Sequence, residues 1–428
     1  MPLIRDVRRL ALYRLVLPFG VALLALLPGT DAIAQPQTLS LSDILARTID
    51  YDPTARAGAA HIRAAEASLD QADTRPNPVL GIEMEDFAGS GNYSRFDETS
   101  TTLYYEELWE RGGKRKARTD IAGAELALAE KRRTANLLDL AAEVQAAWID
   151  AIAAQAAAAL ADDRLAAVKQ MEREFQRRAD RALDPQFAHE RVLAMLSQAQ
   201  IDSEQAALSA QTTRATLASY WGGDGNFRLD EAEFTRLAMN GELDDPTDLA
   251  LLTAARETAA ARVRFEKANS VQDVSLRAGL RHFSADDDVA VVFGVSIPLG
   301  VYDTNRSSIE RAQAEQLAAE IDIAAARNRR QREIARLIAA QSAGAVEIRR
   351  LDAEILPRLE RALALVREGF NRGGTAFTLL DVTESQRALT DAYSRRIDLL
   401  RRFHLDGMRL DRLSDRHVSL LSNVEHKQ

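Results

Sequence analysis

The stretch VSLRAGLRHFSADDDVAVVFGVSI, residues 274–297, alternates apolar and polar side chains with a period of two. In its first half one side is apolar and the other carries Arg277 and Arg281, and in its second half residues 289–297 supply an apolar row. This alternation predicts two antiparallel strands joined by the turn at residues 285–288. Strands of about 8 to 10 residues have the length that crosses an outer membrane.

A second stretch with the same period lies nearer the N-terminus. In VLGIEME, residues 79–85, Glu83 and Glu85 alternate with apolar residues, and a partner strand is predicted through residues 101–107. If these strands enter a membrane, Glu83, Glu85, Arg277 and Arg281 are expected to face a barrel interior. The strand pattern alone is equally typical of a small soluble sheet with one buried face.

Each predicted hairpin is followed by very long helices. Residues 113–184 contain no proline and one internal glycine, Gly123, which predicts a helix of about 70 residues and roughly 100 Å. Asp184 and Pro185 suit the end of one helix and the start of the next, and this second helix is predicted to run to Ser219. The unit is therefore an antiparallel helical hairpin, 113–219.

The second half of the chain repeats this plan. Arg115 and Arg306 begin matching helices, and Arg181 and Arg372 occupy their far ends, both pairs at a spacing of 191. Pro357 is expected to bend the second copy. The predicted organisation is a first repeat, 35–240, with β-hairpin 79–107, and a second repeat, 241–428, with β-hairpin 273–299, helical hairpin 304–412 and a C-terminal tail.

The first 34 residues have the layout of a cleavable signal peptide: four arginines, an apolar run at residues 15–27, and Ala32-Ile33-Ala34 before the cleavage point. Removing residues 1–34 leaves 51 basic and 62 acidic residues, a balance of −11 that disfavours nucleic acid. The chain has no cysteine, so it has neither disulfides nor lipidation on an N-terminal cysteine. No other stretch offers a continuous apolar segment of spanning length, so a membrane segment would have to consist of strands.

Four strands are too few to close a membrane barrel, because the smallest such barrels have about eight. Open strand edges are not tolerated in lipid. Strands that enter the membrane therefore require several copies of the chain to share one barrel.

Several motifs, in this order, resemble those of the TolC family of outer-membrane efflux proteins, specifically its cobalt-zinc-cadmium resistance branch. They are Arg75–Pro78, Glu107–Arg115, Val295–Leu299, Tyr302–Arg306, Gly369–Gly374 and Leu379–Asp381. The resemblance implies a mainly helical protein with an internal twofold repeat. It further implies a homotrimer with a shared twelve-stranded β-barrel in outer-membrane lipid and a periplasmic α-barrel of long helical hairpins.

The same resemblance implies a passive duct that docks onto a periplasmic adaptor protein and an inner-membrane pump of the resistance-nodulation-division class. Divalent heavy-metal cations are the expected cargo, with drugs or other small toxicants as the alternative. The family's tip motif makes Asp381 a candidate for the periplasmic gate, where a ring of acids favours cations, and Glu190 is its counterpart at the spacing of 191. A solvated aspartate at a helix start is the simpler reading of Asp381.

The hairpin ends are the expected adaptor contacts, because they have no neighbours within a bundle; their residues are Arg181, Leu183, Asp184, Arg372, Gly373 and Gly374. No enzyme or cofactor is expected: His189-Glu190 lacks the second histidine of a zinc-protease helix, and the six histidines are scattered. The remaining alternative is a soluble periplasmic coiled-coil scaffold or adaptor, which predicts one helical hairpin and not two.

Overall fold

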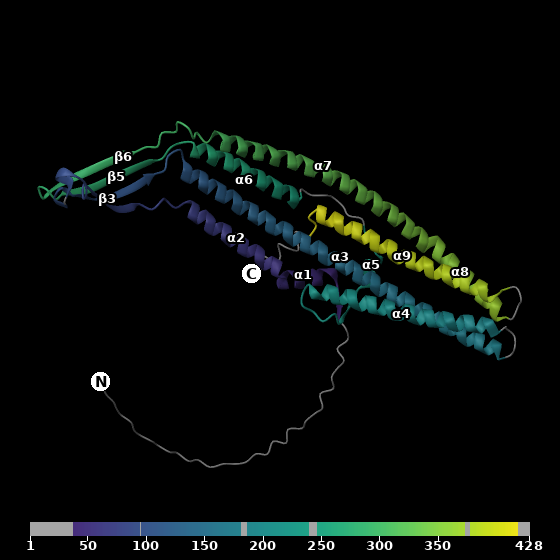
Figure 1. Cartoon of the computed structure of the whole chain (residues 1–428). Coiled ribbons are helices and arrows are strands. Elements are labelled where there is room, and N and C mark those ends of the chain that lie inside the picture. Colours follow the sequence, from purple (N-terminus) through teal and green to yellow (C-terminus); the bar gives the residue numbers. More distant parts are fainter. Residues whose placement is uncertain (1–36, 95, 181–185, 239–245, 373–376, 418–428) are drawn as a thin grey trace, which may run out of the picture.

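The computed structural model describes residues 37–94, 96–180, 186–238, 246–372 and 377–417. The molecule is elongated, with a four-stranded sheet at one end and the ends of two helical hairpins at the other (Figure 1). The predicted fold class is confirmed in every element that one chain can show. The predicted signal peptide, residues 1–34, lies outside the described residues.

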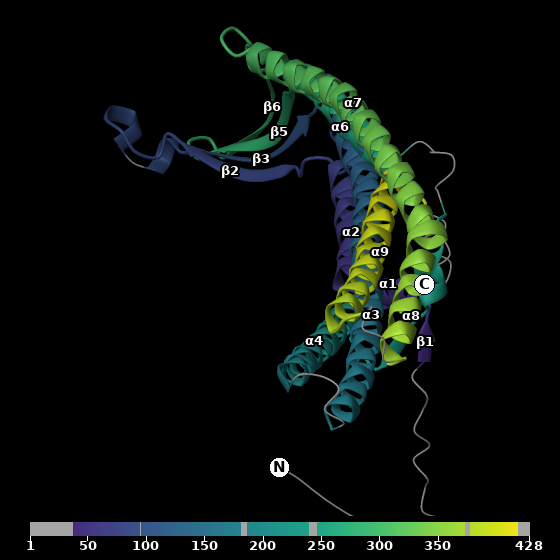
Figure 2. The ribbon, with the colours of Figure 1, turned by 90° about the vertical axis from the view of Figure 1, so that its right-hand side faces the viewer.

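The sheet is antiparallel throughout and joins the two repeats, in the order β2-β3-β5-β6. Its strands are β2 (Val79–Glu85), β3 (Ser100–Trp109), β5 (Val274–Phe283) and β6 (Asp288–Ser296). Two short 3-10 helices, Gly91–Ser94 and Phe96–Glu98, lie between β2 and β3. The strands curve away from the helices as a single layer (Figure 2).

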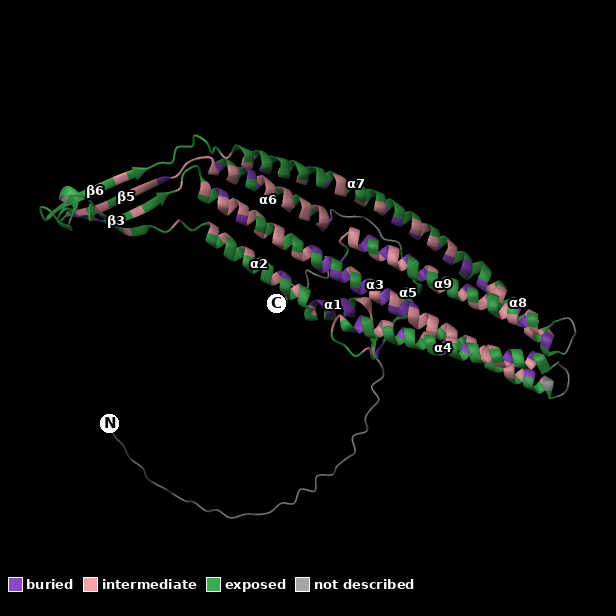
Figure 3. Cartoon of the chain, in the orientation of Figure 1, coloured by how far each residue is buried: buried purple, intermediate pink, exposed green. Residues whose placement is uncertain are grey.

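One face of this sheet is apolar and uncovered. The register aligns Ile82, Leu103, Leu280 and Val291 in one row across the four strands. In this order, the four residues are 71%, 47%, 54% and 81% exposed. Much of the sheet is coloured as exposed in Figure 3. Burying such a face is worth about 25 cal/mol per Å² of apolar surface, so an isolated chain in water leaves a large driving force unused.

Helix α3 (Lys114–Ala179) extends from the sheet to the far end of the molecule, and α4 (Gln186–Ser219) returns antiparallel to it (Figure 1). Helix α3 begins after Gly113, whose φ of 75° suits glycine. The helix ends before the predicted stop at Asp184, and residues 181–185 lie outside the described part of the chain.

The second long hairpin is built from α7 (Arg306–Arg350), α8 (Leu356–Asn371) and α9 (Leu379–Leu413). A π-helical turn, Leu351–Ile355, separates α7 from α8, directly before Pro357. Proline lacks the N–H that would bond to the preceding turn, and its ring occupies space there, so the helix widens at this point. The first copy has no proline at the matching position, and α3 is continuous.

The helices α2 (Pro53–Ala72) and α6 (Thr247–Asn269) lie beside α3 in the half of the molecule nearer the sheet (Figure 1). Around the middle, α1 (Leu41–Tyr51), α5 (Glu231–Thr235) and the parallel pair β1 (Gln37–Leu39) with β4 (Phe227–Leu229) cover the hairpins. The main core lies here; its fully buried members include Leu39, Ile44, Ile149, Ile152, Leu217, Phe234 and Leu400.

Helix α3 corrects one sequence prediction. The sequence predicts no continuous apolar segment of spanning length after the signal peptide, yet the helix over residues 114–178 is long and apolar enough to cross a membrane by length and composition. The reason is the run of alanines in the middle of α3. Ile149, Ala151 and Ile152 are buried there against the central core, and 39% of the apolar window is buried in all.

Candidate functional site

The polar face of the sheet carries a network of ion pairs across its strands. The guanidinium of Arg277 on β5 lies 3.0 Å from Glu106 on β3 and 3.2 Å from Glu83 on β2. Arg281 lies four residues further along the same face of β5. Its guanidinium is 2.6 Å from the Glu85 carboxylate and donates to the Thr102 hydroxyl at 2.9 Å. A network of this kind keeps a surface wet while leaving few charges unbalanced.

Tyr104 fills the space between these charged residues. Its ring lies over Gly81, where an added Cβ would be 2.5 Å from the Tyr104 Cζ, and its Cβ crowds Gly279 on the other side. The Arg277 guanidinium stacks 4.0 Å from the ring centroid. The two glycines therefore let one tyrosine cover three strands.

The structure brings together all four residues that the sequence predicted for a barrel interior: Glu83, Glu85, Arg277 and Arg281. Sequence reasoning missed Thr102, Tyr104 and Glu106, which share their face. The missed signal was the alternation of Thr102, Tyr104 and Glu106 along β3, which only the register with β5 assigns to the polar side.

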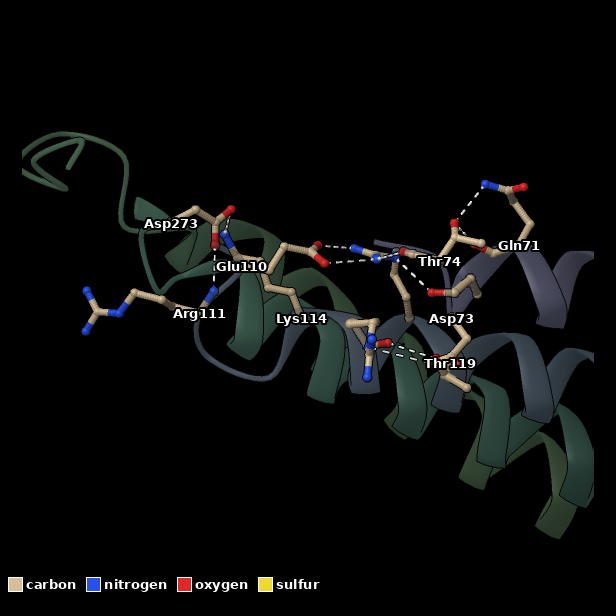
Figure 4. A network of polar contacts seen from close by, with 11 residues as sticks. Gln71, Asp73, Thr74, Glu110, Arg111, Lys114, Thr119 and Asp273 are labelled. Atoms are coloured by element: carbon tan, nitrogen blue, oxygen red, sulfur yellow. Dashed lines mark hydrogen bonds and ion pairs between the residues drawn. The ribbon is translucent and has the colours of Figure 1, made fainter. Parts of the chain in front are cut away.

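A second polar network joins the sheet to the helices (Figure 4). The Asp273 carboxylate, just before β5, accepts a hydrogen bond from the Arg111 backbone N–H at 2.9 Å and pairs with the Lys114 ammonium at 2.7 Å. The side chains of Lys114 and Asp273 are 14% and 22% exposed. Burial raises the pKa of Asp273, but the hydrogen bonds from Lys114 and Arg111 outweigh it and hold the pKa below 3.8.

The same junction is tied to the end of α2. The Arg118 guanidinium pairs with Glu110 and donates to the Thr74 carbonyl at 3.2 Å. Arg115 lies 3.5 Å from Asp73. Together the two networks fix the direction in which the sheet leaves the helices.

Near the far end, Asp381 belongs to the first turn of α9. Its carboxylate accepts hydrogen bonds from the Thr378 backbone N–H and hydroxyl, both at 2.7 Å, in a capping box. These bonds lower the pKa of Asp381 from its usual 3.8. Glu190, its predicted counterpart, is an exposed residue near the start of α4.

The predicted adaptor contacts belong to the ends of the two helical hairpins. Arg181, Leu183, Asp184, Gly373 and Gly374 lie outside the described residues. The remaining one, Arg372, follows α8 and forms an ion pair with Glu368.

An aromatic contact that the sequence did not suggest connects the two hairpins close to these ends. Phe175 of α3 and Phe370 of α8 stack with centroids 5.1 Å apart, and the Arg178 guanidinium lies 4.4 Å from the Phe370 centroid. Arg178 also donates to the Phe370 carbonyl at 3.2 Å. This contact joins helices far apart in the chain, so no local pattern announces it.

No protein-family model matches the chain. Individual curated proteins are similar to the chain in sequence. The cobalt-zinc-cadmium resistance protein CzcC of Cupriavidus metallidurans is 24% identical over 94% of this chain and 100% of its own length. The nickel-cobalt-cadmium resistance protein NccC of Alcaligenes xylosoxydans xylosoxydans is 25% identical over 70% of this chain and 69% of its own length.

Solved structures share the fold. A membrane protein from Pseudomonas aeruginosa superposes with a TM-score of 0.74 at 18% identity, covering 89% of this chain and 91% of the other. CusC, described in terms of folding and transmembrane channel formation, gives 0.73 at 16% identity, with coverage of 91% and 95%.

The fold, with its uncovered apolar sheet face and its two long hairpins, is shared with solved outer-membrane channels, among them VceC and OprN. More narrowly, the chain resembles the TolC family of outer-membrane efflux proteins, as its motifs predict. The resemblance to the cobalt-zinc-cadmium resistance branch is confirmed by the curated relatives.

Proposed function

We propose that the chain forms the outer-membrane duct of a tripartite resistance-nodulation-division efflux system and exports divalent heavy-metal cations as a passive conduit. The observation that carries this proposal is the four-stranded sheet, which is apolar and exposed on one face and lined with paired charges on the other. Lipid over the first face and water over the second would solvate both faces of such a sheet. The metal-resistance names of full-length relatives support the class of cargo.

In this proposal three copies complete one twelve-stranded barrel. Strands β2 and β6 form the two edges of the sheet, and each would pair with the opposite edge of a neighbouring copy. The face with Glu83, Glu85, Arg277 and Arg281 then lines the water-filled interior. The helical hairpins continue the tube into the periplasm, where an adaptor and the inner-membrane pump supply cargo.

The periplasmic end is proposed as the gate and docking region. Asp381, with Glu190 as the second acid, contributes charge to a ring that favours cations. Thr378 holds one Asp381 oxygen, which fixes the direction of the carboxylate. The hairpin turns, including Arg372, provide the adaptor contacts.

Two neighbouring valines test the membrane assignment. Val291 is 81% exposed on the apolar face, whereas Val292 pairs with Gly279 and so lies on the polar face. Val291→Lys places a charge in lipid at a cost of up to about 2–4 kcal/mol per copy near the midplane. Val292→Lys is the matched control, because it adds the same charge to a wet interior.

The two variants are compared in a strain that lacks the chromosomal copy. Wild type and Val292→Lys are expected in the outer-membrane fraction and to restore growth in zinc, cobalt or cadmium, while Val291→Lys is not. Recovery of the wild-type chain in the soluble periplasm would reject the membrane duct. If deleting the chromosomal copy leaves metal tolerance unchanged, the proposal that the duct exports divalent metal cations is rejected.

A further inference from the structure

The internal repeat has a second spacing at the junction between sheet and helices. Thr74 donates its hydroxyl hydrogen to the Gln71 carbonyl at 2.7 Å, and Ser270 donates to the Lys267 carbonyl at 2.7 Å. Both pairs are related by 196 positions, and the same spacing relates Ala72 to Ala268 and Leu80 to Leu276. The linker before β2 therefore corresponds to the linker before β5.

Within one chain, the second of these linkers packs on the start of α3. A Cβ on Gly112 would lie 2.7 Å from the Val271 Cβ and 2.8 Å from the Ala268 carbonyl oxygen, which shows how closely the segments approach. Asp273 reaches the Arg111 N–H and the Lys114 ammonium from the same linker. The seam between the two repeats of one chain is thus closely packed at Gly112 and tied by Asp273.

The corresponding surface of the second repeat is more exposed. At the spacing of 191, the segment before α3 corresponds to residues 299–305 before α7. Leu299, Val301 and Tyr302 are 84%, 67% and 99% exposed, although on one side their linker meets the linker before β5, where a Cβ on Gly300 would lie 3.2 Å from Gln272 Nε2. Their counterparts are better covered, since Leu108 is 39% exposed and the Glu110 side chain 12% exposed, so the greater exposure in the second repeat indicates a missing neighbour.

We infer that residues 74–78 of a second copy cover this surface, and that Arg75 of that copy pairs with Asp303. Arg75 stands 196 positions before Val271, and Asp303 stands 191 positions after Gly112, the two residues in closest contact at the internal seam. Both Arg75 and Asp303 are exposed, and neither forms an ion pair within the described part of the chain. Their opposite charges suit one contact.

The two seams then differ in chemistry. Asn77 stands where the internal seam has Asp273, and Asn305 where it has Lys114, so the buried ion pair is kept inside the chain. The seam between copies instead has its ion pair at Arg75 and Asp303, nearer to solvent. Burying an ion pair carries a desolvation cost, and copies associate without that cost because positions 77 and 305 are both asparagine.

This inference rests on the proposed oligomeric duct, so the test separates the two. Arg75→Asp and Asp303→Arg, made singly, are each expected to reduce the oligomer of the detergent-purified full chain, measured by light scattering, because like charges meet at every seam. The double variant is expected to restore the wild-type distribution. Lys116→Asp is the control, since Lys116 is an exposed residue of α3, whose neighbours α2 and α6 belong to its own chain.

A second measurement uses the absence of cysteine from the chain. Asn77→Cys with Tyr302→Cys, treated with a short bis-maleimide, is expected to give covalent dimers and trimers. The equivalent internal pair, Arg111→Cys with Asp273→Cys, should give only monomers with an internal link. If wild type is oligomeric but the first pair gives no ladder and the charge exchange restores nothing, the seam is wrongly assigned; if wild type is monomeric, the duct itself is wrong.

Discussion

The ion pair between Lys114 and Asp273 is expected to hold the sheet to the helices, and its worth follows from its burial. Lys114→Met leaves the Asp273 carboxylate, 22% exposed, with the Arg111 N–H alone. A fully buried pair costs about 3–5 kcal/mol when broken and an exposed one about 0–1, so about 1–3 kcal/mol is expected here. The measurement is a guanidinium unfolding series on the detergent-solubilised chain.

A double-mutant cycle with Asp273→Asn isolates the pair from the loss of packing. The control cycle uses Lys116 and Asp120, 3.1 Å apart but 80% and 32% exposed, where about 0.3–0.5 kcal/mol is expected. Equal coupling energies in the two cycles would refute the reasoning from burial. Because the folded pKa of Asp273 is lowered, its coupling is present above pH 3.8 and is lost as pH falls through the folded pKa.

Three further outcomes are expected. Asp381→Asn keeps an acceptor for the helix cap but removes the charge, so cation selectivity in planar bilayers should fall; an unchanged reversal potential would remove Asp381 from the gate. Phe370→Ala loses the stack with Phe175 and should cost about 3 kcal/mol in chemical unfolding, whereas a loss under about 1 would show that the hairpins are not clasped there. Burial lowers the pKa of His404 from 6.5, so the unfolded chain binds the proton more readily and the stability of the fold should decrease as pH drops below 6.5. In thermal melts between about pH 7 and 5, His404→Gln should show a smaller decrease than the wild type. An identical decrease in both proteins would contradict this prediction.

The polar sheet face also bears on how cargo would pass through the proposed duct. Arg277 and Arg281 are each paired with acids, so the face presents balanced charge and not a run of carboxylates. A duct needs a wet lining more than a strong binding site, because tight binding slows release. Selectivity is therefore expected to depend on the periplasmic end and on the pump.

Local patterns in the sequence predicted which face a side chain occupies, but long-range pairing was not predictable from them. Period-two alternation assigned Glu83 and Arg277 to one face because a strand's side chains point to opposite sides, a rule that needs no tertiary information. Which glutamate each arginine meets was not predictable, because the register of β3 against β5 joins residues about 170 positions apart in the chain. Likewise Pro357 predicted a disturbance, but only the packed helix showed that it becomes a π-helical turn.

By itself the sequence determined the long helices, the four amphipathic strands, the repeat and, through its motifs, the resemblance to metal-resistance proteins, because these depend on local periodicity and composition. Only the tertiary structure decided three contacts. They are the stacking of Phe175 on Phe370, the packing of Tyr104 against Gly81 and Gly279, and the ion pair of Asp273 with Lys114 at the start of α3. Each of these joins segments that are brought together only when the chain folds, and long-range packing leaves no mark in the spacing of neighbouring residues.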